Sequence, residues 1–376
     1  ISNKGALWVA IQIPDGYVSA HANHARIMTF PFQKVNNFND PKQTVFHSPD
    51  VISYARKAGY YTGEDKDFSF SDVYAPLDFG AARFCEARVW AMFNRVNKDM
   101  VKYEDYAMGY NLKNRMPLYI KADKKLTVLD VIALNRDYYQ NTKMDMTKDM
   151  GAGPYGCIVR WRPLTWKVDG VEYFNERAVS TQQTGFAFVA QARSWLPNPI
   201  GGIFWFGVDD TYSNCYTPIY CGTTKVPESY AVGNGDMMTY SETSAFWTFN
   251  EVSNFAYTRY NVIIKDIQAV QSELENKYFN NVANIDKEAV ELYKKDVKAG
   301  LEYITNYSVN TGNETVKRWR QLYKDLFVKY MDGNIKTKVP GQRNPKVSQP
   351  GYGEDWYKRI VKETGDKFKV VGSSGH

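Results

Sequence analysis

The sequence predicts an α+β fold of layered helices and strands, and two observations support this prediction. Between Gly156 and Val208 the chain is rich in β-branched and aromatic residues, in segments separated by Gly and Pro, as is typical of strands. From Ser244 onward, apolar residues recur at the spacing of amphipathic helices. Because the predicted strands lie between two groups of predicted helices, we expect a layered α+β architecture.

The first third of the chain is predicted to contain a hairpin and three helices. Residues 6–22 hold two apolar segments joined by Pro-Asp-Gly, a composition that favours a β-hairpin. The next element is a helix with Ser48 as its N-cap and Gly59 as its stop. Apolar residues at helical spacing predict a second helix over 78–96, and a third helix follows the N-cap Thr127.

The later segments are predicted from the same two signals, a composition that favours strands and apolar residues at helical spacing. Strands are expected within residues 156–166, 177–192 and 201–208. Helices are expected along the apolar stripe from 252 to 274 and near 287–304 and 315–330. The predicted domains are a core over residues 1–243, C-terminal helices over 244–335, and a tail over 336–376 that ends in the tag-like sequence GSSGH.

The charge pattern and the hydropathy of the chain argue against two classes of partner, nucleic acids and membranes. Lys and Arg number 47 against 41 Asp and Glu, a formal net charge of +6. Much of the excess follows Lys287 and is interleaved with acids, which indicates solvated helix faces, so no nucleic-acid partner is expected. No stretch approaches the ~18–20 uncharged apolar residues of a membrane span, so no membrane partner is expected.

The segment YVSAHANHARI concentrates His21, Asn23, His24 and Arg26 directly after an apolar stretch. In a strand, residues three positions apart point to opposite faces, so His21 and His24 are poorly placed to share a metal ion. No second His or Cys cluster completes a coordination set. The sequence therefore predicts neither a metal site nor a cofactor.

The four cysteines, Cys85, Cys157, Cys215 and Cys221, show no Cys-X-X-Cys spacing. Cys215 and Cys221 bracket a turn and can form a disulfide if their Cα atoms approach within ~7 Å, or remain free thiols. Cys85 lies inside an apolar helical turn, where a structural thiol is expected rather than a partner of a catalytic His.

Three long motifs occur in order along the chain: GALWVAIQIPDGYVSAHANHARI, FSFSDVYAPLDFGAARFCEARVW and FWTFNEVSNFAYTRY. They closely resemble the cysteine-dependent dipeptidase family of the N-terminal-nucleophile hydrolases, relatives of the penicillin V acylases and bile salt hydrolases. The resemblance implies an αββα sandwich. It also implies that an N-terminal Cys attacks the amide with its own α-amino group as the base, so that no catalytic His is needed.

Within this resemblance, Asn23 matches an asparagine that hydrogen-bonds the reacting centre. Arg83 matches a helix arginine held against the nucleophile, where its charge favours the thiolate. Arg26 and His21 belong to the same motif and are assigned to substrate binding. Arg88 lies outside the matched positions and is expected to tolerate substitution.

The resemblance further implies short peptides as substrates and a nucleophilic Cys that this chain lacks. An N-terminal segment of the same gene product is therefore an expected partner, possibly as a separate chain, and a homo-oligomer is expected. Without that segment, the apolar faces of ALWVAIQI and GFAFVAQA would be exposed. The expected location is periplasmic or extracellular, with the cytoplasm as the alternative.

A binding module without catalysis is the alternative function. The stretch ARSWLPNPIGGIFWFGVDDTYSNCY carries Trp195, Trp205, Tyr212 and Tyr216, which could serve as stacking platforms for peptides or glycans.

Overall fold

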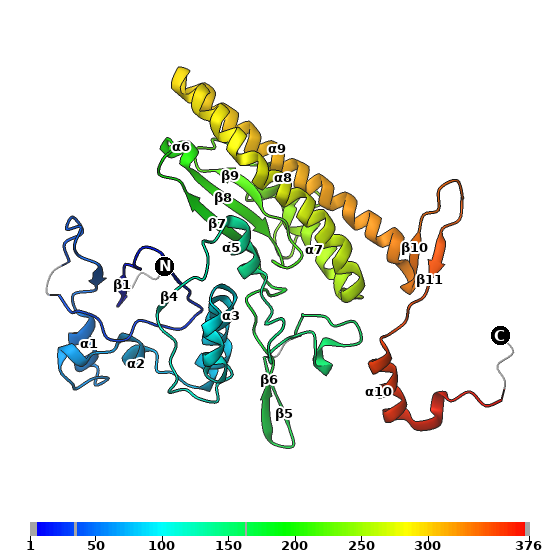
Figure 1. The fold of residues 1–376 in the computed structure, drawn as a ribbon, viewed down its shortest axis with the longest axis horizontal. Helices are drawn as coiled ribbons and strands as arrows, with labels where there is room; N and C mark the ends of the chain where they lie inside the picture. Colours follow the sequence, from blue (N-terminus) through cyan, green and yellow to red (C-terminus); the bar gives the residue numbers. More distant parts are fainter. Residues whose placement is uncertain (1–5, 34–35, 162–163, 373–376) are drawn as a thin grey trace. The chain divides into compact units, whose positions relative to one another are not determined.

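The structure, a computed structural model, describes residues 6–33, 36–161 and 164–372. The chain forms two compact units, and each contains residues from two stretches of the sequence. Unit 1 comprises residues 1–130 and 163–179, and unit 2 comprises residues 131–162 and 180–376. Helices accompany small antiparallel sheets in both (Figure 1), which confirms the predicted α+β class.

The described residues of unit 1 form three two-stranded sheets and a set of short helices. Its strands are β1 (Val9–Ile11), β2 (Tyr17–Ser19), β3 (Val45–His47), β4 (Tyr119–Lys121), β5 (Thr165–Val168) and β6 (Val171–Phe174). Its helices are α1 (Val51–Lys57), α2 (Phe70–Tyr74), α3 (Ala87–Val96) and α4 (Glu104–Ala107), with the π-helical segment η2 (Ala81–Glu86) and the 3₁₀ segments η1 (Asp65–Asp67) and η3 (Lys98–Tyr103). Helix α5 (Val128–Asn135) spans the sequence boundary between the units.

The predicted hairpin over residues 6–22 is wrong, although its turn forms. Tyr17 N donates to Pro14 O at 3.1 Å, and Gly16 takes a φ of 81°. However, β1 pairs with β3 and β2 pairs with β4, both antiparallel. Strand β1 packs Val9 and Ile11 against the apolar cluster around α1, and this burial separates it from β2.

Of two N-caps predicted from the sequence, the cap of α5 is confirmed and the cap of α1 is wrong. At α5, Asp130 N donates to Thr127 Oγ1 at 3.2 Å and Thr127 N donates to Asp130 Oδ2 at 2.8 Å, so the predicted cap is confirmed as a reciprocal capping box. At α1 the predicted cap is wrong, because Asp50 occupies the N-cap position. The Ser48 hydroxyl instead accepts from Trp8 N at 3.1 Å.

The helix predicted over 78–96 forms, but it begins with the wider π-helical turn η2 before continuing as α3. Trp90 and Phe93 anchor α3 in the core of unit 1. The π segment also buries Arg83 and Glu86. Because π turns place extra residues in a helix and often occur at functional sites, this segment is a structural marker for the candidate site.

The described part of unit 2 contains a three-stranded antiparallel sheet that packs against helices. The sheet has the order β7 (Phe186–Ala192), β8 (Gly202–Val208), β9 (Thr217–Tyr220). Its helices are α6 (Asn198–Gly201), α7 (Ala245–Tyr257), α8 (Tyr260–Lys295), α9 (Val297–Tyr330) and α10 (Glu354–Thr364). The remaining elements are β10 (Ile335–Thr337), β11 (Lys346–Ser348) and the 3₁₀ segments η4 (Met150–Ala152), η5 (Glu228–Tyr230), η6 (Met331–Gly333) and η7 (Gly365–Phe368).

Three of the predicted helices and strands have different boundaries in the structure. The helix expected over 287–304 is divided, because Asp296 ends α8 in an extended conformation and caps α9 by accepting from Lys298 N at 2.9 Å. The stripe from 252 to 274 is likewise divided between α7 and α8 at Arg259. Among the described residues of the strand expected over 156–166, only Thr165 and Trp166 belong to a strand, β5.

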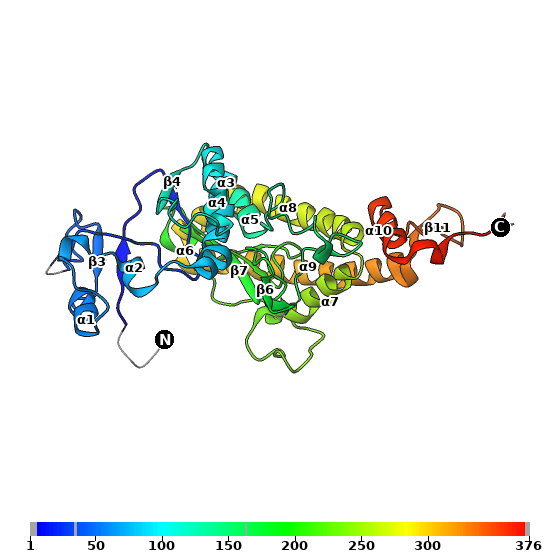
Figure 2. The same ribbon diagram turned by 90° about the horizontal axis from the view of Figure 1, so that it is seen from below.

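The two faces of the β7–β8 pair differ sharply. Val189, Ile203 and Trp205 are buried, and the Trp205 ring lies 6.2 Å from that of Phe279 on α8. Figure 1 shows α8 and α9 running along the sheet, and Figure 2 shows α7 beside α9. Phe186 and Phe188 on the opposite face are 61% and 47% exposed, so the sheet is layered with helices on one face and leaves aromatic residues accessible on the other.

No helix in the described ranges combines the length and the apolar character needed to cross a membrane.

The last four residues of the tag-like sequence GSSGH lie outside the described residues. The predicted start of the C-terminal helices at residue 244 falls one position before α7.

Candidate functional site

Asn23 lies in a bend after β2, with a left-handed φ of 55°. Asparagine is one of the few non-glycine residues that adopt this conformation readily. Its exposed side chain accepts a hydrogen bond at Oδ1 from Arg88 Nη2, at 2.8 Å. Arg88, near the start of α3, also donates from Nε to Phe84 O at 2.9 Å. Arg88, which lies outside the matched positions, is therefore in direct contact with a predicted site residue.

Arg83 projects from the π segment η2 and is only 6% exposed. Its guanidinium carbon lies 4.9 Å from the centroid of the Phe174 ring, and Nη2 is 3.5 Å from Glu176 Oε1. Within the described part of the chain, its Nε and Nη1 have no hydrogen-bond partner. A buried guanidinium with unused donors costs free energy, and such groups in native proteins call for an explanation such as a ligand or a catalytic role.

Arg26 has the opposite environment, although it is equally buried. Its Nε donates to Glu86 at 3.1 Å, and its two terminal nitrogens donate to the backbone oxygens of residues 20, 117 and 118. Tyr106 OH also donates to Glu86, at 3.1 Å, and burial followed by the charge of Glu86 raises the pKa of Tyr106. Arg26 thus fixes the backbone of the motif, and the geometry does not support its predicted role in substrate binding.

The histidines of the motif lie in different environments. His24 is buried, with Nε2 2.9 Å from Ala75 O and Nδ1 3.9 Å from Glu86 Oε1. His21 is exposed and lines a cavity of about 300 Å³ together with Val9, Ile11 and Phe70. Its predicted contact with substrate stays a prediction. No group of three or more His, Cys, Asp or Glu side chains in the described residues could hold a metal ion.

The four cysteines are all free thiols, so the alternative of a Cys215–Cys221 disulfide is wrong. Burial raises the pKa of the Cys157 thiol to about 11 and that of the Cys215 thiol well above its usual value. Because the thiolate is the nucleophilic form, neither group is activated at neutral pH. Cys85 is half-buried within η2.

Unit 2 contains a buried acidic pair that sequence reasoning missed. Asp209 and Asp210 follow β8 and are 2% and 1% exposed. Ser253 Oγ donates to Asp209 Oδ2 at 2.6 Å, and Tyr257 OH donates to Asp210 Oδ2 at 2.9 Å. Burial, and then the charge of Asp210, raise the pKa of Asp209 to about 7. The adjacent acids after a strand were the available signal, but burial could not be inferred from it.

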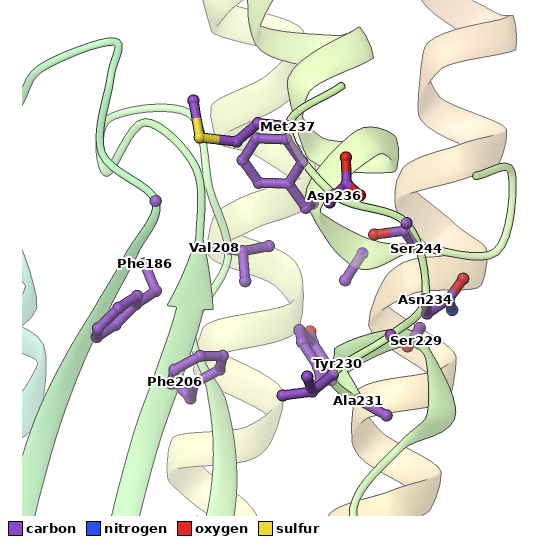
Figure 3. A pocket seen from close by; sticks show the side chains of 16 residues that line it. Phe186, Phe206, Val208, Ser229, Tyr230, Ala231, Asn234, Asp236, Met237 and Ser244 are labelled. Carbon is purple, nitrogen blue, oxygen red and sulfur yellow. The ribbon is translucent and has the colours of Figure 1, made fainter. Parts of the chain in front are cut away.

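A second cavity lies in unit 2, with a volume of about 390 Å³. Figure 3 shows Phe186 and Phe206 from the sheet on one side, and Asn234, Asp236 and Met237 from the loop before α7 on the other. The sequence gives no indication of this cavity, because its lining residues come from separate segments that meet only in the folded chain. The cavity is lined mainly by apolar side chains and backbone.

The proposed stacking platforms are largely contradicted by burial. Trp205 is 1% exposed and Tyr216 is fully buried, so neither ring can stack on a bound ligand. Tyr212 is half-buried, and only Trp195 of the four predicted residues, at 77% exposure, is open to solvent.

Comparison with known proteins identifies the family. The model of peptidase family C69 matches residues 1–273, and the chain therefore belongs to this family. This confirms the cysteine-dependent dipeptidase family that the three motifs indicated. Its relation to penicillin V acylases stays a prediction.

The chain is also similar to several curated proteins. A probable dipeptidase of Salmonella dublin is 22% identical over 223 residues, covering 59% of this chain and 43% of the relative. A probable dipeptidase of Latilactobacillus sakei is 23% identical over 339 residues, covering 88% of this chain and 63% of the relative. The chain thus spans about half the length of the curated relatives it matches.

Proposed function

We propose that this chain is the larger part of a cysteine-type dipeptidase, which hydrolyses short peptides through an acyl-thioester. The observation that carries the proposal is Arg83, a buried guanidinium with two donors that no described residue uses. Membership of peptidase family C69 and the printed names of the relatives support the peptidase activity.

In the proposed reaction, the nucleophile is an N-terminal Cys on a segment of the same gene product that precedes this chain. The α-amino group of that Cys accepts the thiol proton, and the sulfur attacks the peptide carbonyl carbon. Asn23 donates a hydrogen bond to the oxygen of the tetrahedral intermediate, while the charge of Arg83 stabilises the thiolate. The C–N bond then breaks, the amine leaves with the proton, and water hydrolyses the thioester.

The chain's own side chains favour an external nucleophile. Burial raises the thiol pKa values of Cys157 and Cys215, which opposes thiolate formation. His24 and His47 are buried and engaged with backbone atoms. An N-terminal Cys that uses its own amine needs neither of these groups.

The test is hydrolysis of a dipeptide panel by the full-length gene product. We expect turnover that is lost when the first Cys of the mature protein is replaced by Ala, and a covalent acyl-enzyme adduct on that Cys by mass spectrometry. An absence of turnover, together with measurable affinity for a glycan, would favour the binding-module alternative.

The exposed aromatic face of β7–β8 supports the predicted αββα sandwich. Helices α8 and α9 supply one outer layer, and Phe186 and Phe188 face away from the buried side of the sheet. We propose that the N-terminal segment helps to cover apolar surface of this kind, since patches of exposed aromatic residues usually mark interaction sites. Intact-mass analysis of well-folded protein should detect that segment, and a species with the mass of this chain alone would contradict the proposal.

A further inference from the structure

The contact between Arg88 and Asn23 determines how the asparagine amide is oriented. An amide can present either its oxygen or its nitrogen to a neighbour, and the two are hard to distinguish by shape alone. Arg88 resolves the choice chemically, because a guanidinium has only donors. The atom 2.8 Å from Arg88 Nη2 must therefore be the acceptor Oδ1.

The opposite edge of the amide is consequently a donor. Asn23 is exposed, and no described residue accepts a hydrogen bond from its Nδ2. Its left-handed φ of 55° fixes the direction in which the side chain leaves the backbone. With the oxygen occupied by Arg88, the N–H groups are the part of the amide left for a ligand.

Arg88 is itself held in place by the helix that carries it. Its Nε donates to Phe84 O, one turn earlier in the π segment η2, at 2.9 Å. One planar guanidinium thus joins a helix backbone to the Asn23 side chain. A planar fork can make both bonds at once, whereas a lysine ammonium cannot reproduce this geometry.

We propose that Arg88 is a positioning residue, which fixes the Asn23 amide so that Nδ2 donates to the carbonyl oxygen of the bound substrate. This inference rests on the proposed function, since it adds to the hydrolysis a residue that makes no contact with substrate. Arg83 and Arg88 then have separate tasks on one helical segment: Arg83 supplies charge, and Arg88 supplies orientation.

A double-mutant cycle in the full-length gene product tests this coupling. Arg88→Ala should lower kcat by roughly 10-fold to 100-fold with little change in KM, because misplacing a reacting group by about 1 Å has effects of this order. Asn23→Ala should lower kcat by ~10²–10³, the effect of losing one oxyanion donor. In the Asn23→Ala background, Arg88→Ala should lower kcat by less than about threefold, since coupled residues are not additive.

Two further variants separate orientation from charge. Asn23→Asp keeps an acceptor for Arg88 but removes the Nδ2 donor, and it should lose as much activity as Asn23→Ala. Arg88→Lys should recover only part of the loss in Arg88→Ala. Arg56→Ala is the matched control, because Arg56 pairs with Asp65 on the surface of unit 1, and it should keep normal kcat.

The proposal is overturned if Arg88→Ala has no effect, or lowers kcat by the same factor in both backgrounds. It is also overturned if Asn23→Asp retains activity. A crystal structure of the Arg88→Ala variant supplies a substrate-free measurement: the Asn23 side chain should leave its wild-type rotamer, and an unchanged rotamer would disprove the positioning role. Absence of dipeptide turnover by the wild type would instead reject the proposed function, while the crystal structure would still decide the role of Arg88.

Discussion

Two arginines, the buried Arg83 of unit 1 and the largely buried Arg136 of unit 2, differ in how their donors are used. In unit 2, Arg136 Nη2 and Nη1 contact the two oxygens of Glu275 at 2.5 Å and 2.9 Å, and Nε donates to Thr211 O at 2.8 Å. In unit 1, Arg83 makes one contact of 3.5 Å with a carboxylate, and two of its nitrogens have no described partner. Both guanidiniums also lie over an aromatic ring.

This difference distinguishes a structural charge from a candidate functional one. A fully hydrogen-bonded ion pair satisfies the polar groups that folding buries. A guanidinium with unused donors contributes less to folding and keeps its hydrogen-bonding capacity for a ligand. We therefore expect changes at Arg136 to act on stability and changes at Arg83 to act on rate.

The largest effect is expected from Arg136→Met. The substitution keeps most of the side-chain volume but leaves Glu275 buried without its cation, which typically costs about 3–5 kcal/mol of unfolding free energy. Denaturant unfolding measures this loss. If Arg136→Met lowers kcat while the unfolding free energy stays unchanged, the assignment of a structural role is wrong.

Arg83→Met should show the reverse behaviour. We expect kcat of the full-length gene product to fall by ~10²–10³, the effect of losing one preorganised electrostatic group. The melting temperature should stay the same or rise, because the unpaired donors are removed. Arg83→Lys should restore activity only in part, since an ammonium lacks the planar fork. Normal turnover, or loss of activity only through unfolding, would refute the site assignment.

Asp209→Asn extends the comparison to the buried acids of unit 2, which should also affect stability alone. The pKa of Asp209 is raised from 3.8 to about 7 in the folded protein, so the folded state holds a proton that the unfolded state has lost between these pH values. Stability should therefore fall as pH rises from 3.8 to about 7 and then level off.

The Asp209→Asn variant should lack this part of the pH dependence and be more stable at pH 8 by about 1–3 kcal/mol. Urea unfolding of both proteins across this pH range measures the difference. An unchanged pH profile in the variant would show that Asp209 does not titrate as expected. The kcat of the variant should remain close to that of the wild type.

The smallest effect is expected from Glu176→Gln. The Glu176 carboxylate is the charged group 3.5 Å from Arg83, and a contact of this length is weak. We expect kcat to change by less than about threefold, because Arg83 would keep its charge and its position over Phe174. A loss as large as that of Arg83→Met would mean that the ion pair, rather than the free guanidinium, is what the reaction requires.

Sequence reasoning located the candidate site by motif but could not describe its contacts. It selected Asn23 and Arg83 through resemblance and treated Arg88 as a residue that tolerates change. The structure connects Arg88 to Asn23, which lies on a different element far away in the sequence. Neither periodicity nor composition contains this information, because it depends on where α3 packs.

Features that depend on residues close together in the chain could be predicted from the sequence. The capping box of Thr127 and Asp130 needs residues three positions apart, and the helical stripes of α7 to α9 need only their own spacing. Tertiary structure alone decided the partners of β1 and β2, because hydrogen bonds between strands join residues from distant parts of the chain. It also decided which of the two arginines is paired, since a partner such as Glu275 reaches Arg136 only when a long helix packs against the sheet and its loops.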